Sequence, residues 1–274
     1  MPAGGEPGAV GDIGGGGAAG SADEGRLPRF VVTVVATGAL VVVAAVPHLT
    51  PAALLSLLPF ILLVVLAERF TNLDFGRTSI SIGSVMSMAA AAAGGPAAGA
   101  LVGMVNGLAS LRLAQTSPLK SPFNVAAIAL SAAAAGLPAW AAAVWGGRAD
   151  PALHNWLTLG AGVAGGLLFY AVNYSLLAMV VALDSGTDWP TEWRLRCGWL
   201  APHYATMGSI GAGLTLLYGA SGVFGLALML APAGMLYYAQ RQYVAHTGAY
   251  VGALSTLNRD LSSTNGRLSE TLAE

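Results

Sequence analysis

The sequence predicts an all-α polytopic membrane protein, with a bundle of about eight transmembrane helices and then a long cytoplasmic C-terminal helix. Two observations of composition support this fold class. Hydrophobic residues make up 55% of the chain and charged residues only 9%, whereas soluble domains carry about 25% charged residues. The third observation is that charges, prolines and glycines separate apolar runs of membrane-spanning length. Such a composition cannot cover a water-soluble surface.

Residues 1–25 are rich in Gly and Ala and predict a disordered cytoplasmic tail. A cleavable signal peptide is not indicated, because no basic segment is followed directly by an apolar core. The glycine run at 14–17 is not followed by the Lys-Ser/Thr pair of a phosphate-binding loop, so we interpret it as flexible linker.

Residues 26–240 contain eight apolar runs, and about 20 apolar residues suffice to span the hydrocarbon layer. The third and fourth runs are short and are joined by Gly94, Gly95 and Pro96. They therefore predict either a tight helical hairpin or a re-entrant pair that does not fully cross. The predicted helices are 30–46, 51–67, 79–93, 97–113, 123–145, 156–183, 199–218 and 221–240.

The positions of basic residues predict the orientation, because Lys and Arg accumulate in short cytoplasmic loops. With the N-terminus inside, only Arg148 falls on the outer side. We therefore expect a multi-pass protein of the cell (inner or plasma) membrane with both termini cytoplasmic. Omitting the whole third and fourth pair would preserve this alternation, so charge determines orientation better than helix number. The predicted cytoplasmic residues are Arg26, Arg29, Arg69, Arg77, Arg112, Lys120, Arg194, Arg196 and Arg241.

Small residues recur every four positions on two of the predicted helices. Gly99, Gly103 and Gly107 lie on the fourth helix, and Gly162 and Gly166 lie on the sixth. This spacing lets helix backbones approach closely in lipid. It predicts packing faces without identifying which helices pair.

Residues 241–274 predict a cytoplasmic coiled-coil-like helix, because apolar residues alternate four and three positions apart as in a heptad repeat. Such a seam predicts a homodimer. The pattern is unfinished at Glu274, which suggests either the membrane portion of a longer protein or a solvated amphipathic tail. The seam residues are Tyr250, Leu254, Leu257, Leu261 and Leu268.

The segment 243–274, together with Arg241, resembles the membrane-exit helix of bacterial cyclic-di-GMP signalling proteins of the HD-GYP or GGDEF type. The 68–70 and 79–83 segments, the 94–96 turn, Phe123-Asn124 and the 170–176 stretch also resemble the N-terminal multi-pass membrane sensor module of that family. The resemblance implies a sensory or anchoring input module that passes a conformational change to a dimeric cytoplasmic enzyme. GGDEF and HDxxH motifs are absent from the sequence, so any such output domain would lie beyond residue 274.

Polar residues within the apolar runs are the candidate ligand pocket, because polar groups at membrane depth need partners. They are Asn106, Asn124, Tyr170, Asn173, Tyr174 and His203. The alternative interpretation is that these residues make interhelical hydrogen bonds, worth about 0.6 kcal/mol each on average.

The sequence does not predict catalysis, a cofactor or a metal site. Its four histidines never occur at the i, i+4 spacing of a helical metal pair, and Cys197 is the only cysteine. No acidic residue lies in the middle of a span, and the only lysine, Lys120, lies in a loop, which disfavours a proton pump and a retinal Schiff base. The near-zero net charge gives no indication of nucleic-acid binding.

We therefore expect a membrane-embedded sensory or anchoring module that signals through its C-terminal helix. The alternative is a small-molecule (vitamin-like) binding subunit of a transporter, which would not need a projecting heptad helix. A purely structural membrane protein is the third interpretation.

Overall fold

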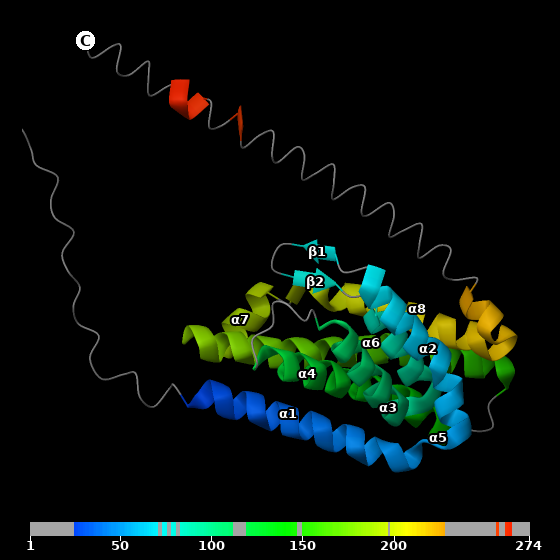
Figure 1. The fold of residues 1–274 in the computed structure, drawn as a ribbon. Helices are drawn as coiled ribbons and strands as arrows, with labels where there is room; N and C mark the ends of the chain where they lie inside the picture. Colours follow the sequence, from blue (N-terminus) through cyan, green and yellow to red (C-terminus); the bar gives the residue numbers. More distant parts are fainter. Residues whose placement is uncertain are drawn as a thin grey trace, which may run out of the picture.

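The computed structural model describes residues 25–70, 73–75, 78–80, 83–111, 119–146, 150–196, 198–227, 256–257 and 261–264. These residues form an all-α membrane helix bundle with one short two-stranded hairpin at one end (Figure 1). The elements are α1 (Arg26–Ala45), η1 (Val46–His48), α2 (Pro51–Phe70), β1 (Leu73–Phe75), β2 (Thr78–Ile80), α3 (Gly83–Ala109), α4 (Lys120–Ala135), α5 (Leu137–Gly146), α6 (Pro151–Ser185), α7 (Trp189–Arg196), η2 (Gly198–Leu200) and α8 (Ala201–Ser221).

The outer surface of the bundle is apolar. Among the described residues, five helical segments are long and apolar enough to cross a membrane: Arg26–His48, Pro51–Glu68, Gly83–Ala109, Lys120–Trp145 and Ala152–Ser185. Leu40 and Trp145 are 68% and 85% exposed, which is unfavourable in water and favourable in hydrocarbon. The predicted all-α membrane bundle is thus confirmed.

The predicted number of eight membrane helices is not supported. The third and fourth predicted helices form one folded element, α3. The seventh corresponds to α8, which is 21 residues long but is not among the five apolar segments, because His, Ser, Thr and Gly interrupt its apolar run. Most of the predicted helix 221–240 lies outside the described residues, as does the tail 1–24.

Helix α3 is a helical hairpin that folds back at Gly95, where φ is 69° and ψ is −161°. This backbone conformation is essentially restricted to glycine. A methyl group at Gly99 would lie 2.9 Å from the Ala91 side chain, and one at Gly83 would contact Asn106, although a straight helix would separate Gly83 and Asn106 by about 35 Å. The predicted fold-back at residues 94–96 is therefore confirmed, while the extent to which the pair crosses the membrane stays a prediction. Its arms, 83–94 and 96–109, are about 18–21 Å long, shorter than a hydrocarbon layer of about 30 Å. The 27-residue segment is therefore long enough to cross only by its total length, and neither arm spans the layer alone.

The start predicted for the third helix, residue 79, is wrong, because the helix begins at Gly83. Residues 78–80 instead form strand β2, which pairs antiparallel with β1 through Leu73 and Ile80, Asp74 and Ser79, and Phe75 and Thr78. Residues 79–82 alternate Ser and Ile. That period of two is typical of a strand. The four residues also directly precede the apolar run from residue 83, so they were included in the predicted helix.

Two further helix boundaries differ from the prediction. The segment 123–145 is two helices, α4 and α5, which meet at Gly136. A methyl group at Gly136 would lie 2.5 Å from the backbone nitrogen of Pro96, so this turn packs on the turn of the α3 hairpin. The short helix α7 was not predicted, because its eight residues carry too little periodicity to distinguish a helix from a loop.

The predicted glycine faces are contact surfaces between specific helix pairs. A methyl group at Gly103 would lie 2.6 Å from the Ala132 side chain of α4, and one at Gly107 would lie 2.6 Å from the Val125 Cα atom. On α6, a methyl group at Gly162 would lie 2.6 Å from the backbone oxygen of Gly208 in α8. The second arm of α3 therefore packs on α4, and α6 packs on α8, at backbone contact distance.

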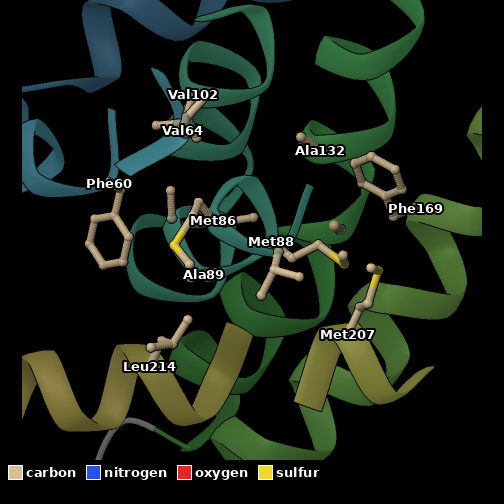
Figure 2. Packing of buried hydrophobic residues seen from close by; sticks show 14 of the residues in the cluster. Phe60, Val64, Met86, Met88, Ala89, Val102, Ala132, Phe169, Met207 and Leu214 are labelled. Carbon is tan, nitrogen blue, oxygen red and sulfur yellow. The ribbon is translucent and has the colours of Figure 1, made fainter. Parts of the chain in front are cut away.

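The hydrophobic core surrounds the first arm of α3 (Figure 2). Met86 and Ala89 lie between Phe60 of α2 and Leu214 of α8, while Met88 points towards Met207. The Thr215 hydroxyl donates to the Ala89 backbone oxygen at 2.8 Å, which fixes α8 against this arm. Helix α3 contacts α1, α2, α4, α5, α6 and α8. Any movement of the hairpin would therefore reach most of the bundle.

Candidate functional site

An aromatic cluster joins helices α6, α7 and α8. The ring centroid of Tyr170 lies 5.5 Å from that of Tyr174, 5.8 Å from that of Trp193 and 6.0 Å from that of Tyr204. His203 packs edge-on against Tyr204 with a centroid distance of 5.7 Å. These separations are within the usual range for favourable aromatic pairs. We call these five residues the aromatic cluster.

Hydrogen bonds fix the helices that carry the aromatic cluster. The Tyr174 and Tyr204 hydroxyls lie 3.3 Å apart and hydrogen-bond across α6 and α8. The Trp189 indole N–H donates to the Ser175 backbone oxygen at 3.1 Å, which docks α7 onto α6. Contacts between helices therefore hold the Tyr174 and Tyr204 side chains, and α7 is held against α6.

The start of α7 is fixed by Asp188. Its Oδ2 atom accepts the Thr191 hydroxyl at 2.8 Å and the Thr191 backbone N–H at 3.2 Å, as an N-capping residue does. These two hydrogen bonds hold the pKa of the Asp188 carboxyl below its usual value of 3.8.

Two buried polar atoms in the aromatic cluster have no hydrogen-bond partner in the described part of the chain. They are the Trp193 Nε1 atom, a donor, and the His203 Nε2 atom. An unsatisfied buried polar atom costs about 1–3 kcal/mol. Trp193 contacts Tyr170, and His203 contacts Tyr204, so both residues belong to the aromatic cluster. A small polar ligand that accepts a hydrogen bond from Trp193 would satisfy at least one of them.

The structure brings three of the predicted pocket residues into one cluster, namely Tyr170, Tyr174 and His203, the last through Tyr204. Asn173 is partly buried between the two tyrosine positions on α6, and Asn124 is exposed on α4. Asn106 is fully buried and lies beside Gly83 at the open end of the α3 hairpin. Of the predicted seam residues, Leu257 and Leu261 are described, while Tyr250, Leu254 and Leu268 lie outside the described residues.

Four buried or partly buried residues of the helix ends and the aromatic cluster were not predicted from the sequence. Trp193 and Glu192 lie on a helix that was not predicted, and Tyr204 follows the histidine that was chosen. Glu68 is only 4% exposed although it stands in the last turn of α2, at a predicted membrane boundary. The position of Glu68 in the sequence could have indicated its burial. An acidic residue that directly continues an apolar helix needs polar partners at the end of that helix.

The described residues define the class of protein, an all-α membrane protein with aromatic and polar groups at the helix junctions. Within them, no three His, Cys, Asp or Glu side chains are grouped so that they could hold a metal ion. No known family, no curated protein and no solved structure matches the chain. The function therefore has to be argued from the residues themselves.

Proposed function

We propose that the chain is a membrane-embedded sensory or anchoring module that relays a conformational change through its C-terminal helix to a cytoplasmic signalling output domain. The observation that carries the proposal is the exposure of Leu257 and Leu261, at 57% and 59%. Both lie in short helical segments, at residues 256–257 and 261–264. They stand four residues apart in the sequence, a spacing that would place them on one face of the predicted helix 241–274.

Exposed leucines on a polar helix favour pairing with an equivalent surface, because burial of each leucine contributes about 1.5–3 kcal/mol. The heptad spacing of the seam fits a second copy of the same helix. A homodimer of this kind would change helix crossing or register when the bundle changes its arrangement. The resemblance to HD-GYP and GGDEF sensor modules supports the same interpretation and suggests a cyclic-di-GMP enzyme as output.

The relay requires an element that contacts both the helices of the aromatic cluster and the rest of the bundle. The α3 hairpin fits this requirement, since it contacts α2, α4, α6 and α8. A stimulus that favours one position of the hairpin would shift the bundle between two arrangements. On this proposal the chain itself performs no catalysis.

Disulfide cross-linking in native membranes tests the dimer. In a Cys197→Ser background, Leu261→Cys places a thiol on the seam and Ser262→Cys places one next to it, off the seam. We expect Leu261→Cys to form disulfide-linked dimers much faster than Ser262→Cys. Equal rates, or no dimer from either variant, would contradict coupling through this helix.

A second candidate function is supported by the Trp193 Nε1 and His203 Nε2 atoms. Both lack a hydrogen-bond partner among the described residues, and both could bind a small polar ligand. In this alternative the chain is the binding subunit of a vitamin-like transporter, with the aromatic cluster as its pocket. Such a subunit has no use for a paired seam. Failure of Leu261→Cys to cross-link, combined with transport lost in Trp193→Phe, would favour it.

A further inference from the structure

Two helices start side by side at the end of the bundle that the basic residues predict to be cytoplasmic. Phe30 of α1 and Phe123 of α4 contact each other with a ring-centroid distance of 6.5 Å. Further along the same two helices, Ala45 and Ala133 belong to one buried cluster. Helices α1 and α4 are therefore parallel neighbours (Figure 1), and their first turns lie at the same level.

Both first turns carry exposed positive charge. Arg29 directly precedes Phe30, Lys120 lies three residues before Phe123, and both cations are exposed. The Arg29 Nε atom lies 3.8 Å from the point where a methyl group on Gly25 would stand, so this side chain leans back over the start of α1. Within the described part of the chain, neither cation makes an ion pair. Arg26 is also exposed but already interacts within the chain, so the argument rests on Arg29 and Lys120.

The two charges do not stabilise the helices that carry them. A helix N-terminus carries about half a positive charge, so a cation in the first turn is repelled. Neither helix has an acidic residue in its first turn or a side-chain capping hydrogen bond. Asp184, exposed in the last turn of α6, forms no ion pair with either cation. Charge complementarity therefore favours an anion from outside the chain at this end of the helix pair.

The apolar surface beside the cations indicates which kind of anion fits. Val32, Leu40 and Val43 follow Arg29 along α1 and are exposed, and in a bilayer such side chains contact acyl chains. A phospholipid places a charged headgroup and acyl chains in one molecule, in the same order as the cations and the apolar face of α1. A soluble phosphate would use the cations alone.

We propose that Arg29 and Lys120 bind the headgroup phosphate of an anionic phospholipid whose acyl chains lie along α1, with phosphatidylglycerol as the lipid to test. The Arg29 guanidinium can donate two parallel hydrogen bonds to phosphate oxygens, and the Lys120 ammonium adds a compact charge. Basic groups between membrane helices on the cytoplasmic side bind anionic headgroups in this way. The site does not depend on the proposed signalling function, since lipid binding is a property of the bundle alone.

Native mass spectrometry of the full chain, released from nanodiscs with equal amounts of phosphatidylglycerol and phosphatidylcholine, tests the site. We expect the wild-type chain to retain phosphatidylglycerol preferentially. Arg29→Gln and Lys120→Gln should each lower the ratio of retained phosphatidylglycerol to phosphatidylcholine about fivefold, which corresponds to about 1 kcal/mol per basic residue. Arg194→Gln is the matched control and should keep the wild-type ratio. Arg194 is also exposed, but its charge acts on the Asp188 carboxylate.

A conservative variant and a soluble anion make the test specific. Arg29→Lys keeps the charge and should retain most of the preference. Equal retention of both lipids by the wild-type chain would overturn the proposal, as would an equal fall in Arg194→Gln, which would show that any cation at this end attracts the lipid. A rise in Tm with inorganic phosphate in phosphatidylcholine nanodiscs, as large as the rise with phosphatidylglycerol, would assign the cations to a soluble anion instead. None of these results affects the seam cross-linking experiment.

Discussion

At the scale of single residues, two aspartates each directly precede a helix, but only one of them forms capping hydrogen bonds. Asp188 precedes α7 and accepts two hydrogen bonds from Thr191. Asp150 is the N-cap residue of α6 and makes no side-chain capping hydrogen bond. Position before a helix does not therefore identify a functional cap. The hydrogen-bond geometry identifies a functional cap. Asp150 is therefore a suitable control for Asp188.

Replacement of Asp188 by alanine should loosen the first turn of α7. We expect severalfold faster hydrogen–deuterium exchange at the backbone amides of residues 191 and 192 in Asp188→Ala, because the Thr191 N–H loses its acceptor. Asp150→Ala should leave exchange at the start of α6 unchanged. Equal effects in the two variants would mean that Asp188 does not cap α7.

The same cap gives a pH dependence. Because the pKa of Asp188 is lowered on folding, its stabilising effect is fully present above the unfolded value of 3.8. It is lost as the pH falls through the lower folded value. Protection of the α7 amides, taken as the exchange rate relative to the intrinsic rate at each pH, should decrease over this acidic range in the wild-type chain and stay constant in Asp188→Ala.

At the scale of helices, the sequence predicted contact faces better than contact partners. The four-residue glycine spacing on the fourth and sixth predicted helices identified surfaces of close approach, which the structure confirms. It could not identify α4 and α8 as the partners, since partner choice depends on how distant segments are arranged. The β1–β2 hairpin was missed because four residues of Ser-Ile alternation are too few to outweigh an apolar run.

The α6–α8 interface provides the test of a glycine contact. A methyl group at Gly208 would contact the Gly162 backbone oxygen and would lie 2.8 Å from the Gly166 nitrogen, whereas one at Gly213 on the same helix would meet nothing within 4 Å. Gly208→Ala should destabilise the bundle by about 1–3 kcal/mol, as overpacking does. Gly213→Ala should raise stability by about 0.5–1 kcal/mol through helix propensity. The measurement is Tm in nanodiscs, and similar shifts in both variants would contradict the close packing.

Candidate sites were predicted less completely than helices, and the reason is physical. Tyr170, Tyr174 and His203 are predicted from their polarity within apolar runs. The two tyrosines contact each other, and His203 joins them through Tyr204. Glu68 was set aside because it stands at a helix end, and only the folding back of α3 brings Asn106 and Gly83 beside it. A hairpin can place residues from distant parts of the sequence together in a way that periodicity alone does not reveal.

At the scale of the whole molecule, the arrangement of charges predicts which end of the bundle faces the cytoplasm. Asp150 stands at the start of α6, and α7 follows the end of that helix. Helix α6 has 35 residues, which corresponds to about 52 Å and exceeds a hydrocarbon layer of about 30 Å. Its two ends should therefore lie on opposite sides of the membrane. The basic residues predict that the α7 end is the cytoplasmic one.

Cysteine labelling in intact cells tests this orientation. In a Cys197→Ser background, Asp150→Cys places an exposed thiol just before α6, and Leu195→Cys places one on α7, beyond the other end of α6. A membrane-impermeant maleimide should label Asp150→Cys in intact cells and Leu195→Cys only after permeabilisation. The reverse pattern would show that the charge bias does not set the orientation of this chain, and the cytoplasmic relay would then fail. Labelling of both thiols in intact cells would instead mean that α6 does not cross the membrane, because its two ends would then share the outer aqueous phase.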